Sequence, residues 1–95
     1  MDGVQIIWHL DDDPDGNVQH LTEHGVRKEE FEEVFLDPRN PVNRSHSSGN
    51  PVKFGWTSTG KHIIVIWQEV QEEPLMILPL TAYPVPPPSK RGRKK

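Results

Sequence analysis

The sequence predicts a small α+β domain in which two helices pack on one face of a mainly antiparallel sheet, in the order β-α-α-β-β-β. Three observations support this fold. A short alternating segment opens the chain, two helical patterns separated by a glycine follow, and three segments rich in β-branched and aromatic residues come last. With 95 residues, the chain is long enough for one domain with a modest core.

The first two elements are defined by alternation and by capping residues. Residues 4–10 alternate in hydropathy, which is typical of a strand with one apolar face. Asp13 is suited to cap a helix, with Pro14 as its first residue, so we expect a helix over residues 14–24. Gly25 follows at the position where a left-handed residue ends a helix. The apolar residues of the strand are Val4, Ile6, Trp8 and Leu10.

A second helix is expected over residues 27–36, because its apolar side chains recur on one helical face. Asp37-Pro38 ends it, since the residue before a proline is disfavoured in helical conformation. Residues 37–51 are rich in Pro, Asn, Ser and Gly and show no periodicity, which indicates a long loop. The apolar face of the helix consists of Phe31, Val34 and Phe35.

Three strands should complete the domain, over residues 52–56, 62–70 and 75–83. Residues 57–60 form the hairpin loop between the first two. Pro79 lies inside the last strand, so that strand is expected at an edge or with a bulge. Inward-facing positions of the strands hold three tryptophans, which we expect in the core: Trp8, Trp56 and Trp67.

Charge divides the chain into a domain over residues 1–83 and a tail over residues 84–95. Residues 1–36 carry ten acidic and two basic residues, whereas the tail is rich in proline and then in Lys and Arg. Such a tail is expected to be disordered. No cysteine is present, and no apolar run reaches the roughly 18 residues needed to span a membrane. We therefore expect a cytoplasmic protein without membrane contact.

His20, Glu23 and His24 form the pattern H-x-x-E-H within the segment HLTEH, which is the inverted signature of zinc hydrolases. On a helix, two histidines four residues apart share a face and can bind one metal ion. A catalytic zinc site needs a third protein ligand, and no spacing in the sequence supplies one. The pattern is also typical of two solvated histidines near a helix C-terminus, so we predict neither a metal nor another cofactor.

The segment HLTEHGVRKEEFEEVFLDP resembles the N-terminal signature of the BrnT-like toxins of bacterial type II toxin–antitoxin systems. Residues 24–26 match its H-G-V core, and residues 34–38 match its V-F-x-D-P motif. Further along the chain, Phe54-Gly55-Trp56-Thr57 and Gly60 resemble the glycine-containing hairpin of the family. The resemblance covers about residues 4–83.

The resemblance implies a RelE-like fold and a metal-independent ribonuclease that is silenced by a cognate antitoxin protein. In such enzymes the RNA 2′-hydroxyl attacks the adjacent phosphate, which requires an acid, a base and a stabilising cation. Three features differ from the family pattern. Lys53 stands where the family has an arginine before the glycine of a strand. Glu23 replaces a basic residue, and residues 80–83 (Leu-Thr-Ala-Tyr) replace a segment that offers an arginine.

Two hypotheses for function therefore follow: a toxin-like ribonuclease, with intact or degenerate activity, and a non-catalytic protein- or nucleic-acid-binding module of the same fold. Candidate residues are those whose side chains are able to move a proton, hold a phosphate or stack on a base. They are His24, His20, Lys53, Arg44, His46 and Tyr83.

Overall fold

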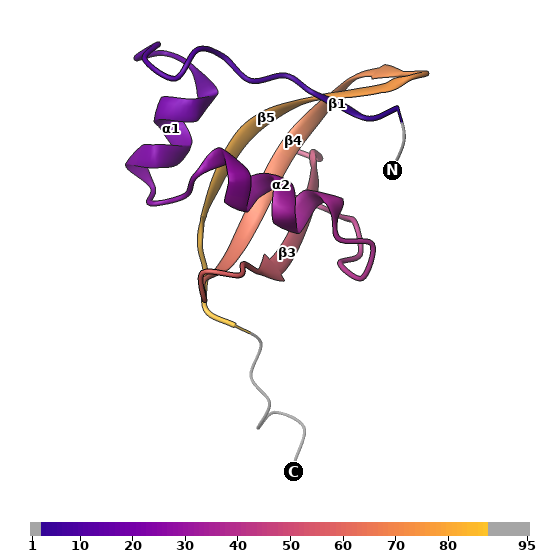
Figure 1. The fold of residues 1–95 in the computed structure, drawn as a ribbon. Helices are drawn as coiled ribbons and strands as arrows, with labels where there is room; N and C mark the ends of the chain where they lie inside the picture. Colours follow the sequence, from indigo (N-terminus) through magenta and orange to yellow (C-terminus); the bar gives the residue numbers. More distant parts are fainter. Residues whose placement is uncertain (1–2, 88–95) are drawn as a thin grey trace.

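The computed structural model describes residues 3–87, and these residues form a small α+β domain, as predicted. Five strands form one mixed sheet in the order β1-β5-β4-β3-β2, and both helices lie on the same face of it (Figure 1). The elements are β1 (Gln5–Ile6), α1 (Asn17–Glu23), α2 (Lys28–Leu36), β2 (Asn43–Arg44), β3 (Pro51–Trp56), β4 (His62–Glu72) and β5 (Leu75–Pro84). Residues 88–95, which hold most of the predicted disordered tail, lie outside the described residues.

The observed order contains one strand more than predicted, because β2 forms within the expected loop 37–51. Asn43 and Arg44 pair antiparallel with Val52 and Pro51. A strand of two residues has no periodicity that a sequence pattern can reveal. The other sheet pairings are antiparallel for β3, β4 and β5, whereas β1 runs parallel to β5.

The first strand is much shorter than the predicted 4–10, because Asn17 takes over its hydrogen bonds. The Asn17 side chain accepts a hydrogen bond from the backbone of His9 (3.0 Å) and donates one to the carbonyl of Ile7 (2.9 Å). The chain therefore leaves the sheet after Ile7. Leu10, predicted on the apolar face of the strand, is 75% exposed.

Helix α1 begins three residues later than predicted. Asp13 does not cap it; its carboxylate instead accepts a hydrogen bond from the backbone of Asp15 (2.9 Å), in a local turn. The predicted end is confirmed. Gly25 has φ +80° and donates to the Thr22 carbonyl, while Val26 donates to the Leu21 carbonyl, which together form a Schellman motif.

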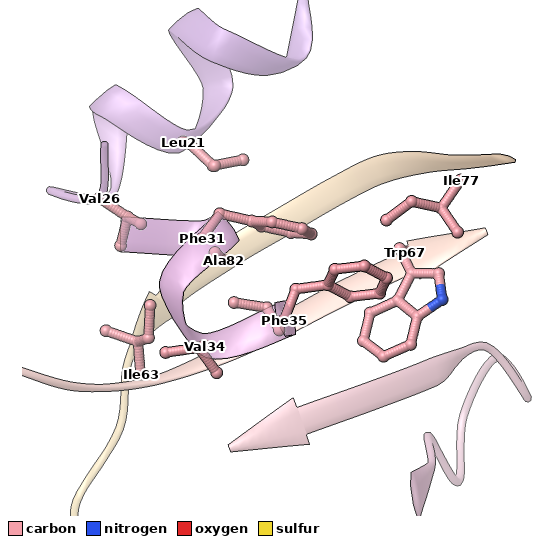
Figure 2. Packing of buried hydrophobic residues seen from close by; sticks show 10 residues of the cluster. Leu21, Val26, Phe31, Val34, Phe35, Ile63, Trp67, Ile77 and Ala82 are labelled. Carbon is pink, nitrogen blue, oxygen red and sulfur yellow. The ribbon is translucent and has the colours of Figure 1, made fainter. Parts of the chain in front are cut away.

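The core lies between α2 and the central strand β4 (Figure 2). The Phe35 ring meets Trp67 edge to face, with 4.8 Å between ring centroids, and Phe31 meets Trp8 at 5.4 Å. Burying each such side chain stabilises the fold by roughly 1.5–3 kcal/mol. The buried cluster consists of Leu21, Val26, Phe31, Val34, Phe35, Ile63, Val65, Trp67, Ile77 and Ala82.

Two of the three tryptophans lie where the sequence predicts, and one does not. Trp67 is buried, and Trp8 packs on the core while its indole N–H donates to Glu32 (2.7 Å). The prediction for Trp56 is wrong, since this side chain is 58% exposed. It lies on the face of the sheet that no helix covers.

Pro79 has both features expected of a proline inside a strand. The pairing of β5 with β4 shifts register at this point, and β1 pairs with β5 only through Met76 and Ile77. The C-terminal half of β5 is therefore an edge, and α1 packs beside it. In the described part of the chain, neither helix is long and apolar enough to cross a membrane.

A buried carboxylate joins the start of α2 to the hairpin between β3 and β4. Glu30 is 4% exposed and accepts hydrogen bonds from the Arg27 backbone (2.9 Å), the Thr59 hydroxyl and the Lys61 ammonium (3.2 Å). Burial alone raises the pKa of Glu30, but these hydrogen bonds outweigh it and lower the pKa below its usual 4.5.

We predict that Glu30→Gln lowers the free energy of unfolding by about 1–3 kcal/mol at pH 7, because it removes a buried, hydrogen-bonded charge. A lowered pKa means that the ionised group stabilises the fold above pH 4.5, and that this contribution is lost as the pH falls through the folded-state pKa. In urea unfolding between pH 7 and 3, the free energy of unfolding of the wild type should exceed that of Glu30→Gln at pH 7, and this difference should shrink as the pH falls. Glu29→Gln, at an exposed position of the same helix, is the control; equal pH profiles for wild type and Glu30→Gln would contradict the prediction.

Candidate functional site

A groove of about 660 Å³ lies on the open face of the sheet, opposite the helices. Lys53 of β3 points toward α2, so its neighbours Val52 and Phe54 point to the open face. The strand registers then place two rows of side chains across the groove floor. One row is Val52, Ile66 and Thr81, and the other is Phe54, Ile64 and Tyr83.

One wall of the groove is built by β2 and the turn that follows it. The turn is closed by backbone hydrogen bonds from Ser45 to Asn50 (2.8 Å) and from Gly49 to Ser45 (2.9 Å). The guanidinium of Arg44 donates to the Gly49 carbonyl (3.0 Å), which holds this side chain against the turn. Arg44 and His46 both line the groove and are exposed.

The opposite side of the groove is the free edge of β5, where α1 places two histidines. His20 Nε2 lies 3.1 Å from the Thr81 hydroxyl, and the His24 ring lies 5.9 Å from the Tyr83 ring. The two imidazoles meet edge to face at 4.9 Å. Because Thr81 and Tyr83 line the groove, the histidines stand at its rim.

Five of the six residues singled out in the sequence therefore gather around one groove. Arg44 and His46 come from the β2 side, and His20, His24 and Tyr83 come from the β5 side. Strands β2 and β5 are separated by three strand spacings, or roughly 14 Å. A ligand that touches both sides must therefore be an extended chain rather than a single small group.

The charge of the groove differs from that of the whole chain, whose net charge is −3. Among the described residues that line the groove, none is acidic. The acidic side chains lie instead on the two helices, in the segment before α1 and at the far end of the β4–β5 hairpin. They are Asp11, Asp12, Asp13, Asp15, Glu23, Glu29, Glu30, Glu32, Glu33, Glu69, Glu72 and Glu73, together with Asp37, which directly follows α2.

Lys53 does not join the groove. Its side chain faces α2, and its ammonium donates to the carbonyls of Phe35 (2.8 Å) and Asp37 (3.1 Å). Phe35 lies in the last turn of α2 and Asp37 is the residue that follows it, and neither carbonyl has a partner within the helix, so Lys53 acts as a cap. Burial lowers the pKa of the ammonium, and the charge of Asp37 partly offsets this.

The H-x-x-E-H pattern places its two histidines on one face of α1, but the described residues offer no third ligand. Within residues 3–87, no group of three or more His, Asp or Glu side chains is arranged to hold a metal ion. Glu23 and His20 border a second hollow, which residues 78–80 of β5 also line, together with His9 and Asp15.

Sequence reasoning missed the contact residue Thr81 and the outward position of Phe54. The alternation of Val52, Phe54 and Trp56 shows that these three residues share a face, and it leaves open which face the helices cover. Comparison with protein families, with curated proteins and with solved structures found no match.

We predict that Lys53→Met lowers the free energy of unfolding by about 1–3 kcal/mol, because it leaves the buried Phe35 carbonyl without its donor and leaves the Asp37 carbonyl with the Asn40 backbone alone. Chemical denaturation measures this loss. The control is Lys28→Met, which removes a partly exposed ion pair with Asp11 and should cost less than about 1 kcal/mol. Equal losses in the two variants would mean that Lys53 does not cap α2.

Proposed function

We propose that this chain is a small, metal-independent ribonuclease of the BrnT-like, RelE-like toxin class, which acts in the cytoplasm and is silenced by a cognate antitoxin protein. The observation that supports the proposal best is the composition of the groove. Arg44, His46 and Tyr83 line it without an acidic neighbour among the described lining residues, and His20 and His24 stand at its edge. Phosphate binding requires such a local excess of cations and donors.

The proposed reaction is a transesterification within the RNA chain. A base removes the proton of a 2′-hydroxyl, whose oxygen forms a bond to the adjacent phosphorus. The bond from phosphorus to the 5′ oxygen of the next nucleotide breaks, and an acid gives this oxygen a proton. The products are a 2′,3′-cyclic phosphate and a 5′-hydroxyl, so neither water nor an oxidant enters the step.

The β5 side of the groove holds the groups suited to this proton transfer. Imidazoles change charge near neutral pH, and two of them lie within 4.9 Å of each other at this edge. In the proposal His24 and His20 exchange protons with the RNA, and Tyr83 contacts the reacting nucleotide. Arg44 and His46, roughly 14 Å away across three strands, bind a phosphate further along the RNA.

The second candidate function is a non-catalytic RNA-binding module with the same groove. It is favoured by the distance between Arg44 and the histidine pair, because no arginine or lysine among the groove-lining residues stands at the β5 edge to stabilise a reacting phosphate. Both functions require RNA binding, and only the first requires strand scission. Cleavage assays therefore separate them.

We predict that the purified protein cleaves a single-stranded RNA in the presence of EDTA, and that a 2′-deoxy substitution at the cleaved nucleotide abolishes cleavage without weakening binding. His24→Ala should reduce the rate by about 10²–10⁴-fold, the usual contribution of a general acid or base. Product ends are identified by mass spectrometry.

Induction of the chain in a bacterial host should arrest growth, and co-expression of the antitoxin should relieve the arrest.

Binding without cleavage in every RNA tested would leave the non-catalytic module as the function. Unchanged cleavage by both His24→Ala and His20→Ala would remove these histidines from the reaction. Both side chains are exposed, so the variants are expected to fold, and circular dichroism checks this.

We predict that Arg44→Ala weakens RNA binding for all sequences alike and reduces the slope of log affinity against log salt by about one. Fluorescence anisotropy at several salt concentrations measures this slope. Arg39→Ala is the matched control, because Arg39 is exposed, pairs with Asp37 and is not part of the groove lining. An equal change of slope in both variants would show that Arg44 makes no specific phosphate contact.

A further inference from the structure

Three rings form a continuous aromatic surface on the open face of the sheet, at the end of the groove. The Phe54 and His62 rings are stacked, with 6.5 Å between centroids and 15° between planes, and the Trp56 ring lies 5.1 Å from His62. Phe54 is 41% exposed and Trp56 is 58% exposed. We call Phe54, Trp56 and His62 the aromatic platform.

The platform continues the groove without a break. Phe54 belongs to the row with Ile64 and Tyr83 on the groove floor, and it also lines the groove. Trp56 and His62 are paired across β3 and β4 in the next row on the same face. Successive rows lie roughly 6.6 Å apart, because they are two residues apart along a strand. A polynucleotide in the groove therefore reaches the platform within about one nucleotide.

The rings are held in place before any ligand arrives. Cross-strand pairing fixes Trp56 opposite His62, and the His62 imidazole lies 3.3 Å from the Val85 carbonyl. Rings that are already oriented lose little conformational freedom on binding, which favours affinity. Phe54 and Trp56 are both exposed, and adjoining exposed apolar side chains mark interaction sites more often than scattered ones do.

The charge around the platform favours a polyanion over an acidic or apolar peptide. The Glu33 carboxylate reaches the hairpin beside Trp56, but it is held there by hydrogen bonds from the Ser58 backbone (3.0 and 2.9 Å). The adjoining groove carries Arg44 and His46 with no acidic residue among its described lining. Nucleobases stack on aromatic faces whatever their sequence, whereas the bases of a duplex are stacked on each other and present no free face.

We propose that the aromatic platform is a base-stacking subsite, on which Trp56 and Phe54 hold an unpaired nucleobase next to the RNA segment in the groove. This inference rests on the proposed function, and it names the substrate class as single-stranded RNA. A duplex of the same sequence cannot use this subsite, because its bases are stacked on each other and cannot reach the rings.

The test combines a change in the protein with a change in the RNA. A short oligouridine and the same oligonucleotide with abasic sites are titrated into the wild type, Trp56→Ala and Val70→Ala. Val70 is the control, because it is an exposed apolar residue of β4 (46%) that is not part of the groove lining or of the platform. Anisotropy gives the affinities, and tryptophan fluorescence reports stacking directly.

Loss of one base stack is expected to weaken binding by about five- to 150-fold. The abasic RNA should show this loss with the wild type and with Val70→Ala, and little further loss with Trp56→Ala. Oligouridine should quench the fluorescence of the wild type, and this quenching should largely disappear in Trp56→Ala. The annealed duplex should bind more weakly than the single strand.

Two results would overturn the subsite while RNA binding by the groove stands. One is an equal abasic penalty in the wild type and in Trp56→Ala. The other is a Trp56→Ala variant that keeps the full affinity of the wild type for oligouridine. Absence of any RNA binding by the wild type would instead overturn the proposed function itself, and the subsite with it.

Discussion

Phe31 and Phe35 of α2 pack against the central part of the core, Phe35 directly against Trp67 of β4, and this contact fixes which face of the sheet is covered. Once α2 lies across β3 and β4, Lys53 reaches the carbonyls at the end of the helix. Val52, Phe54 and Trp56 must then point to the other face. Both helices lie on the core side, so the open face is bordered by the short β2 and its turn on one side and by the edge of β5, with His20 and His24, on the other. The groove follows from this division.

The same division separates the charges. Most acidic side chains lie on the helices and in the segment before α1, whereas the described groove lining contains Arg44 and His46 and no carboxylate. The net charge of −3 therefore says little about the groove. At physiological salt, exposed charges more than about 8 Å apart are largely screened from each other. Local composition, and not the total, decides what this face attracts.

The sequence located most of the candidate site because functional side chains have recognisable chemistry, even when their positions in space are unknown. Helical spacing links His20 to His24, and Arg44 and His46 share a polar loop. The structure brings both pairs to one groove. Lys53 shows the limit of this reasoning. A lysine in a strand can point to either face, and only the position of α2 decides that its ammonium caps a helix.

The sequence by itself determined the features that depend on neighbouring residues: the end of α1 at Gly25, the two helical faces, the hairpins and the irregularity at Pro79. The tertiary structure alone decided the short β1, the added β2, the exposure of Trp56 and the meeting of α1 with the edge of β5. The physical reason is that backbone conformation and periodicity are local. Which face is buried, and which distant side chains meet, depends on contacts such as the hydrogen bonds of Asn17 to Ile7 and Pro79.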